Sequence, residues 1–190
     1  MRVVVLAHPR SGTGYTAWCF QCGGWDVGHE KIAHDGISSW QWAVKSDAVP
    51  WGAPRGERSL PETVLHVMRE PAAAISSIAF TETSTEDWRA KWVHIPRDAE
   101  PIERAIWSYL GWNLLIQAQG PTHRAQLESI ETMVAAMTRQ YPLLVPKGHR
   151  NDRMHASLSA DQIKATPWRY PITTQLWDRV NAMYGEMVDG

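Results

Sequence analysis

The sequence predicts an α/β protein, a three-layer α/β/α arrangement with a central parallel sheet. Two observations carry this prediction. The chain contains two short, apolar, β-branched segments, and each is followed by a polar turn and then a helix-like segment. Strand, turn and helix in repetition are typical of parallel sheets, because the helix returns the chain to the edge where the next strand begins. The chain has 190 residues, 44% apolar and 21% charged, which suits one globular domain spanning residues 1–190.

The predicted strands are the apolar segments themselves. Residues 2–7 (RVVVLA) are continuously apolar after Arg2, as expected of a strand that is buried on both faces. Residues 63–68 (TVLHVM) form a second strand after a loop punctuated by proline and glycine. Residues 123–127 form a shorter candidate strand later in the chain.

The predicted helices are justified by helical spacing of apolar residues, by alanine content and by capping signals. In chain order they span residues 15–22, 72–80, 101–119, 130–140 and 173–187. A further helix is expected to start at Ser159, where Ser-Ala-Asp-Gln forms a capping box behind Leu158. Between them, residues 81–100 are irregular and aromatic, and we interpret this segment as a lid or substrate loop.

Charge and hydropathy exclude several classes of protein. The chain has 19 Lys and Arg against 20 Asp and Glu, so its net charge of −1 provides no field that would gather nucleic acid. The longest apolar run, residues 3–7, is far below the roughly 20 residues that span a bilayer, and only Arg2 precedes it. We therefore expect a cytoplasmic protein with no membrane span and no nucleic-acid partner.

The most informative segment is residues 8–15 (HPRSGTGY), which lies between the first strand and the first helix. Small residues allow backbone amides to approach an anion, and the helix N-terminus adds unpaired donors and the positive end of its dipole. The ordinary nucleotide-hydrolase loop, which ends in Gly-Lys-Ser/Thr, is absent from the sequence. The segment therefore predicts a phosphate or sulfate site without the usual ATP arrangement, formed by Arg10, Ser11, Gly12, Thr13, Gly14 and Tyr15.

This loop resembles that of a known enzyme family. Residues 9–13 (PRSGT) are similar to the 5′-phosphosulfate loop of sulfotransferases, Pro-Lys/Arg-Ser/Thr-Gly-Thr-Thr/Ser, which use 3′-phosphoadenosine 5′-phosphosulfate (PAPS). A second motif agrees, since that family holds the 3′-phosphate with an Arg at a strand end and a Ser eight residues later. Here Arg69-Glu70-Pro71 is followed by Ser77. A guanidinium offers a planar fork to a phosphate, and a hydroxyl on the helix adds a donor.

The resemblance covers most of residues 1–130 and carries functional expectations with it. It implies the P-loop NTPase-like sulfotransferase fold and PAPS as co-substrate, with no metal required. It also implies transfer of a sulfuryl group to a hydroxyl or amine acceptor, such as a sugar, a lipid or another small molecule. Arg10 would contact the phosphate–sulfate bridge, and Arg69 and Ser77 would hold the 3′-phosphate.

The chain departs from the family pattern at three points. Gly14 replaces the second hydroxyl residue of the loop, which removes a side-chain contact but leaves the backbone cradle. Arg10 replaces the commoner Lys, and a guanidinium does not titrate, so it can stabilise a leaving group but cannot act as an acid. The family's late Arg-Lys-Gly signature is only echoed by residues 147–150 (KGHR), which would otherwise be a solvated basic loop.

Three candidates compete for the catalytic base that takes the acceptor proton. Glu30 leads, because some sulfotransferases use a Glu on the segment after the first helix, and His29 is either the base itself or the group that orients it. Asp47 follows Lys45 where cytosolic sulfotransferases carry Lys-Thr-His, so Asp stands in the position of that His. His94, in the irregular segment, is the third candidate. Each of these residues could instead be an ordinary exposed polar group.

A zinc site is a competing interpretation of one cluster. Cys19 and Cys22 form Cys-x-x-Cys, with His29 and His34 downstream. A zinc finger needs roughly 12 to 15 residues before the first His, and here only residues 23–28 intervene. We therefore expect two free thiols and no metal site.

Two other functions remain open at the level of sequence. One is a kinase or other nucleotide enzyme of the same fold, and the other is a nucleotide-binding module without catalysis. The chain also contains 11 Trp, whose flat faces suit an acceptor site or a core equally well. The Trp residues that would wall the acceptor site are Trp40, Trp42, Trp51, Trp88, Trp92, Trp107 and Trp112.

Overall fold

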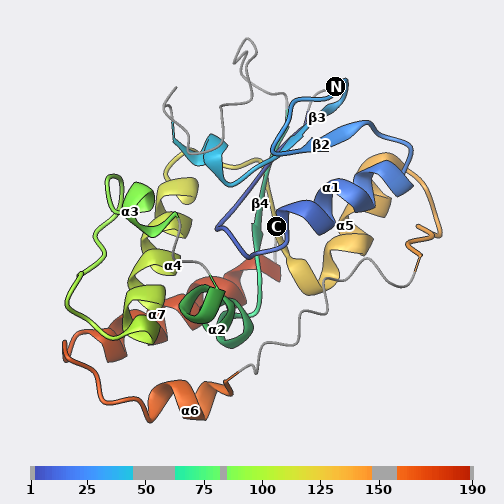
Figure 1. The fold of residues 1–190 in the computed structure, drawn as a ribbon. Coiled ribbons are helices and arrows are strands. Elements are labelled where there is room, and N and C mark those ends of the chain that lie inside the picture. The colour runs from blue at the N-terminus through green and yellow to red at the C-terminus, as the bar shows by residue number, and fades with distance from the viewer. Residues whose placement is uncertain (1–2, 45–62, 82–84, 147–157, 189–190) are drawn as a thin grey trace.

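A single parallel sheet organises the protein (Figure 1). The computed structural model describes residues 3–44, 63–81, 85–146 and 158–188. Within these ranges five strands pair in the order β2-β3-β1-β4-β5, and each pairing is parallel. The strands are β1 (Val3–Ala7), β2 (Val27–His29), β3 (Gly36–Ser38), β4 (Thr63–Met68) and β5 (His123–Gln126). The predicted α/β class with a parallel sheet is therefore confirmed.

The helices follow the predicted pattern closely. They are α1 (Thr13–Cys22), α2 (Pro71–Thr81), α3 (Glu86–Arg89), α4 (Pro101–Gln117), α5 (Ile130–Thr138), α6 (Ala160–Lys164) and α7 (Thr173–Gly185). The predicted capping box is confirmed, with Ser159 and Gln162 each bonding the other's backbone amide. The segment predicted to be irregular contains the short helix α3. None of these helices is long and apolar enough to cross a membrane.

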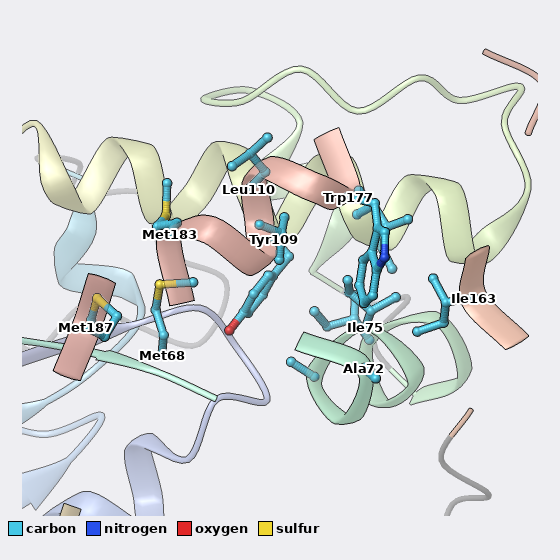
Figure 2. Packing of buried hydrophobic residues seen from close by; sticks show 14 residues of the cluster. Met68, Ala72, Ile75, Tyr109, Leu110, Ile163, Trp177, Met183 and Met187 are labelled. Atoms are coloured by element: carbon cyan, nitrogen blue, oxygen red, sulfur yellow. The ribbon is translucent and has the colours of Figure 1, made fainter. Parts of the chain in front are cut away.

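Helices cover both faces of the sheet. On one face α1 and α5 pack against alternate residues of the central strands, in a buried cluster that includes Val5, Phe20, Val67 and Val134. On the other face Val4 and Leu6 of β1 contact α4 through a cluster that includes Trp112 and Ile116. Helices α2, α4 and α7 join in a further cluster around Tyr109 and Trp177, seen from close by in Figure 2. Burial of β1 on both faces agrees with its uninterrupted apolar sequence.

The strands β2 and β3 were not predicted. Only residues 30–35 join these two parallel strands, whereas such connections ordinarily take a dozen or more residues. The return is tight enough that a Cβ on Gly28 would lie 1.9 Å from the carbonyl oxygen of Lys31. Gly36 has φ +149, and a Cβ there would lie 1.9 Å from the carbonyl oxygen of Val3. Both positions therefore require glycine, which weakens the sequence signal of a strand.

Candidate functional site

The candidate site lies at the carboxyl ends of β1 and β4. These two strands are neighbours in the sheet. The helices that follow them lie on opposite faces of the sheet, since α1 packs with α5 and α2 packs with α4. In open parallel sheets such a reversal leaves a crevice in which ligands bind. Both anion motifs predicted from the sequence occupy the turns at this reversal.

The predicted phosphate loop, residues 8–15, turns sharply from β1 into α1. Arg10 and Gly12 both have left-handed backbone, with φ of 72° and 84°. The amide of Ser11 donates to the carbonyl of His8 at 3.0 Å and closes the turn, while the Ser11 side chain is fully buried. A Cβ on Gly12 would lie 2.4 Å from Cδ1 of Leu127, the residue directly after β5, so this position is crowded as well.

The start of α1 supplies the backbone donors. The first helical bond runs from the amide of Thr16 to the carbonyl of Gly12 at 2.9 Å. The amides of residues 13–15 precede that bond, so they belong to the first turn, whose donors have no intrahelical acceptor. The hydroxyl of Tyr15 donates to Glu131 on α5, so Tyr15 contributes its amide rather than its ring to the loop. By contrast, the first turn of α2 is capped internally, since the Glu70 carboxylate accepts from the amides of Ala72 and Ala73.

The two predicted anion motifs contact each other directly. The Arg10 side chain donates from Nε to Ser77 Oγ at 3.1 Å, and Arg69 donates from Nη1 to the carbonyl of Arg10 at 3.2 Å. Tyr109 fixes the backbone of Arg69, because its hydroxyl donates to the Arg69 carbonyl at 2.6 Å and accepts from the Arg69 amide at 3.2 Å. In Figure 2 the phenol oxygen points toward the end of β4. Arg10 therefore contacts both residues of the second motif, Ser77 through its guanidinium and Arg69 through its backbone carbonyl.

Glu30 and His29 lie at the end of β2, on the other side of the phosphate loop. Glu30 has left-handed backbone with φ 54°. Its carboxylate accepts from the hydroxyl of Ser39 and, at 3.4 Å, from the amide of Trp40. His29 Nε2 lies 3.6 Å from Glu30 Oε1 and 3.1 Å from Thr13 Oγ1. These contacts connect the leading candidate base to the first residue of α1.

The geometry excludes a proton relay through the two ring nitrogens of His29. The same nitrogen, Nε2, faces both Thr13 and Glu30. A neutral imidazole nitrogen either accepts or donates, so it cannot accept from the threonine hydroxyl while donating to the carboxylate. His29 therefore does not link Thr13 and Glu30 through opposite ring nitrogens, and Glu30 receives its hydrogen bonds from Ser39 and Trp40.

The ionisation of this pair suits proton transfer near neutrality. Burial raises the pKa of Glu30 to about 7, although the hydrogen bonds from Ser39 and Trp40 act in the opposite direction. Partial burial lowers the pKa of His29. At neutral pH the imidazole is therefore uncharged, and the carboxyl is poised between its two forms, as general bases in active sites commonly are.

The position of His29 explains the departure at Gly14. A Cβ on Gly14 would lie 3.3 Å from Cε1 of His29, so the imidazole covers the site where the sulfotransferase loop has a hydroxyl side chain. The imidazole instead contacts the preceding hydroxyl, that of Thr13. The absence of a side chain at Gly14 therefore leaves room for the imidazole of His29.

The remaining predicted candidates lie apart from this site or outside the described residues. Lys45, Asp47, Trp51 and residues 147–150 are outside the described residues. His94 is exposed and lies edge-on to Trp107, with ring centroids 5.0 Å apart. Cys19 and Cys22 are free thiols, and no group of three His, Cys, Asp or Glu side chains in the described ranges could hold a metal ion.

The tryptophans divide between core and surface. Trp40, Trp88 and Trp112 pack against one another with ring centroids 5.2 to 5.8 Å apart, and Trp112 is fully buried. Trp112 is therefore part of the core and not an acceptor wall. Trp92 is 42% exposed and lies 6.0 Å from Trp88. The aromatic cluster thus extends from Trp40, beside Glu30, to the surface.

Sequence reasoning missed the residues that hold the site in place. Ser39 binds the Glu30 carboxylate, and Ser38 donates to the carbonyl of Thr13 at 2.7 Å. Two consecutive serines after Gly36 and Ile37 were the available signal. Behind the loop, Arg89 and Ser108 are fully buried polar residues that no motif indicated, and His8, the first residue of the predicted loop segment, is also fully buried.

Comparisons with known protein families, with curated proteins and with solved structures find no match for this chain. Any function assigned to it therefore rests on its own residues and their contacts.

Proposed function

We propose that this protein is a PAPS-dependent sulfotransferase, which transfers a sulfuryl group to a hydroxyl or amine acceptor. One observation carries the proposal, namely the contact between the two anion motifs. The Arg10 guanidinium bonds Ser77, and the Arg69 guanidinium bonds the backbone of Arg10. PAPS carries phosphate on both ends of one ribose, so it needs two anion sites that are close together. Residues drawn from two adjacent strand ends meet that need.

In this proposal the two motifs divide the nucleotide between them. The amides at the start of α1 and the Arg10 side chain bind the 5′-phosphosulfate, since a helix N-terminus and a guanidinium both favour an anion. Arg69 and Ser77 bind the 3′-phosphate. The bond from Arg10 to Ser77 engages one of the five N–H donors of that guanidinium, and Arg10 therefore keeps the capacity to contact both ends.

Glu30 acts as the general base. The acceptor oxygen or nitrogen forms a bond to sulfur while the bond between sulfur and the bridging phosphate oxygen breaks. The acceptor proton passes to the Glu30 carboxylate, and adenosine 3′,5′-bisphosphate leaves with the bridging oxygen. Arg10 stabilises the charge that grows on this leaving phosphate, as positioned cations do in phosphoryl transfer. The pKa of about 7 at Glu30 suits this role at neutral pH.

The experiment is a calorimetric titration with adenosine 3′,5′-bisphosphate and, separately, with ADP. We expect the 3′,5′-bisphosphate to bind at least tenfold more tightly, because only this nucleotide presents a 3′-phosphate to Arg69 and Ser77. Equal affinities would remove the assignment of the second motif. Tighter, magnesium-dependent binding of ATP would instead support the kinase alternative.

Transfer itself is tested with PAPS labelled on sulfur and a panel of sugar, lipid and aromatic acceptors. Label should appear in an acceptor, together with release of adenosine 3′,5′-bisphosphate. Binding of the nucleotide without transfer to any acceptor would identify a binding module and contradict the enzymatic part of the proposal.

A further inference from the structure

A chain of hydrogen bonds runs behind the phosphate loop. Arg89 on α3 donates from Nε to Ser108 Oγ on α4 at 2.9 Å. Ser108 Oγ lies 2.9 Å from His8 Nε2, and His8 Nδ1 lies 2.6 Å from the carbonyl oxygen of Pro9. The side chains of His8, Ser108 and Arg89 are all fully buried. A buried polar network of this kind is strong when each group has its partner and costly when one is lost.

The partners determine the direction of every proton in this chain. A carbonyl oxygen only accepts, so His8 carries its proton on Nδ1 and donates it to Pro9. Nε2 of the neutral ring is then an acceptor, and the Ser108 hydroxyl donates to it. The Ser108 oxygen in turn accepts from the Arg89 guanidinium. Burial, followed by the nearby charge of Arg89, lowers the pKa of His8 well below its usual range, which agrees with a neutral ring.

This series of hydrogen bonds ends at Pro9, the residue before Arg10. The peptide that follows the Pro9 carbonyl leads into the left-handed backbone of Arg10, so the direction of this carbonyl fixes the start of the loop. At its other end Arg89 also donates to the hydroxyl of Thr85. These hydrogen bonds therefore connect α3, in the segment predicted as a substrate loop, with the turn that carries Arg10.

We propose that Arg89 is a positioning residue for the phosphate loop, which it holds in the anion-binding conformation by acting through Ser108 and His8 on the Pro9 carbonyl. This inference rests on the proposed function, because it assumes that the loop binds an anion. It adds that nucleotide binding and the order of α3 support each other, since coupling between two sites is reciprocal.

The first test is made on the unaltered protein. Nitrogen-15 NMR of the His8 ring at neutral pH should find the proton on Nδ1 and an unprotonated Nε2. A ring protonated on Nε2, alone or on both nitrogens, would break the chain and overturn the proposal, whatever the variants do.

The second test compares two buried serines. Ser108→Ala removes the central link, whereas Ser76→Ala is the matched control on α2, where Ser76 donates to the carbonyl of Ala72 at 2.7 Å and accepts from the amide of Leu158 at 2.9 Å. We expect affinity for adenosine 3′,5′-bisphosphate and for pyrophosphate to fall about tenfold in Ser108→Ala, as for loss of a hydrogen bond to a charged group, and to stay unchanged in Ser76→Ala. Equal losses in the two variants, or none in either, would contradict the positioning role.

Hydrogen exchange provides a readout that does not need a variant to fold. Saturation with either ligand should slow exchange of the α3 amides in the wild-type protein. Unchanged exchange in α3 on saturation would overturn the coupling. Binding of pyrophosphate without preference for the 3′,5′-bisphosphate over ADP would defeat the proposed function alone, and this inference would still be decided with pyrophosphate. Binding of neither ligand would overturn both.

Discussion

The two halves of the site differ in their place in the sheet and in their chemistry. The anion half lies between β1 and β4, which are buried strands with helices on both sides, and its charged groups are guanidiniums. The Glu30 half lies at the sheet edge, at the end of the three-residue strand β2, and its charged group is a carboxyl with a pKa of about 7. Guanidiniums stay charged at every physiological pH, whereas this carboxyl does not. Under the proposed function, this difference predicts that nucleotide binding and proton transfer can be altered separately.

The largest expected effect comes from the edge half. In Glu30→Gln we expect kcat to fall 100-fold or more, because loss of a general base removes about 10²–10⁴ of rate. Affinity for adenosine 3′,5′-bisphosphate should not change, since no anion contact is altered. Steady-state kinetics with the labelled PAPS assay and calorimetry measure the two quantities. Glu186→Gln, the same change at an exposed residue, is the control. A Glu30→Gln enzyme with normal kcat would assign the base elsewhere.

The next largest effect is expected in the anion half, where a substitution should weaken nucleotide binding. Arg69→Met is expected to weaken binding of adenosine 3′,5′-bisphosphate by about 10- to 100-fold, the usual range for charge-assisted hydrogen bonds, and to leave ADP binding unchanged. Arg169→Met is the matched control, because Arg169 lies before α7 and pairs with Asp98 at 3.0 Å. Equal weakening for both nucleotides would show that Arg69 does not distinguish the 3′-phosphate.

The edge half can also be tested through stability, without any ligand. The folded-state pKa of Glu30, about 7, lies above the ordinary value of 4.5, so the folded protein retains a proton that the unfolded chain has already lost. The free energy of unfolding should therefore decrease as pH rises from about 4.5 to 7, and the loss should be complete above pH 7. Glu30→Gln cannot lose this proton, so we expect the variant to be more stable than the wild type by about 3 kcal/mol at pH 8 and equal to it at pH 4. Urea unfolding at the two pH values measures the free energy of unfolding of both proteins. A difference between variant and wild type that is the same at both pH values would show that the pKa of Glu30 is not raised by burial.

The same ionisation should appear in the pH profile of the reaction. A base must be unprotonated to accept the acceptor proton, so kcat should decrease about tenfold for each pH unit below the Glu30 pKa of about 7. Affinity for adenosine 3′,5′-bisphosphate should vary much less over the same range, apart from ionisation of the ligand itself. Parallel changes of both quantities would mean that the two halves are not separable.

The anion half was largely predictable because its signals are local in the sequence. The apolar runs of β1 and β4, the Gly12 turn and the proline at the start of α2 each act over a few residues. The predicted elements 63–68 and 173–187 correspond closely to β4 and to α7 with the short turn after it. Arg10 was predicted from the composition of its loop, and Arg69 and Ser77 from the resemblance to the sulfotransferase motifs, but their direct contact was not predicted.

The edge half could be predicted only in part, because it depends on contacts through space. The His29-Glu30 pair was visible as a candidate base, but β2 and β3 are too short and too rich in glycine to give a strand pattern. The bonds from Ser39 and Trp40 to Glu30 depend on the tight return between these strands. Arg89 was missed for a similar reason, since burial of an arginine needs tertiary partners that no local pattern reveals.

Gly14 joins the two halves, and the smallest predicted effect is there. In Gly14→Ala the new Cβ would lie 3.3 Å from Cε1 of His29, closer than ordinary contact, so the imidazole must shift from Thr13. The His29 side chain is 52% exposed and has room to move, so we expect folding and nucleotide affinity to be retained and kcat to fall about threefold, as for loss of a weak positioning contact. Gly185→Ala, at a helical glycine with nothing within 4 Å of a new Cβ, is the control for the change itself. If Gly14→Ala instead weakened nucleotide binding and left kcat unchanged, the imidazole would belong to the anion half, and the boundary between the two halves would have to be moved.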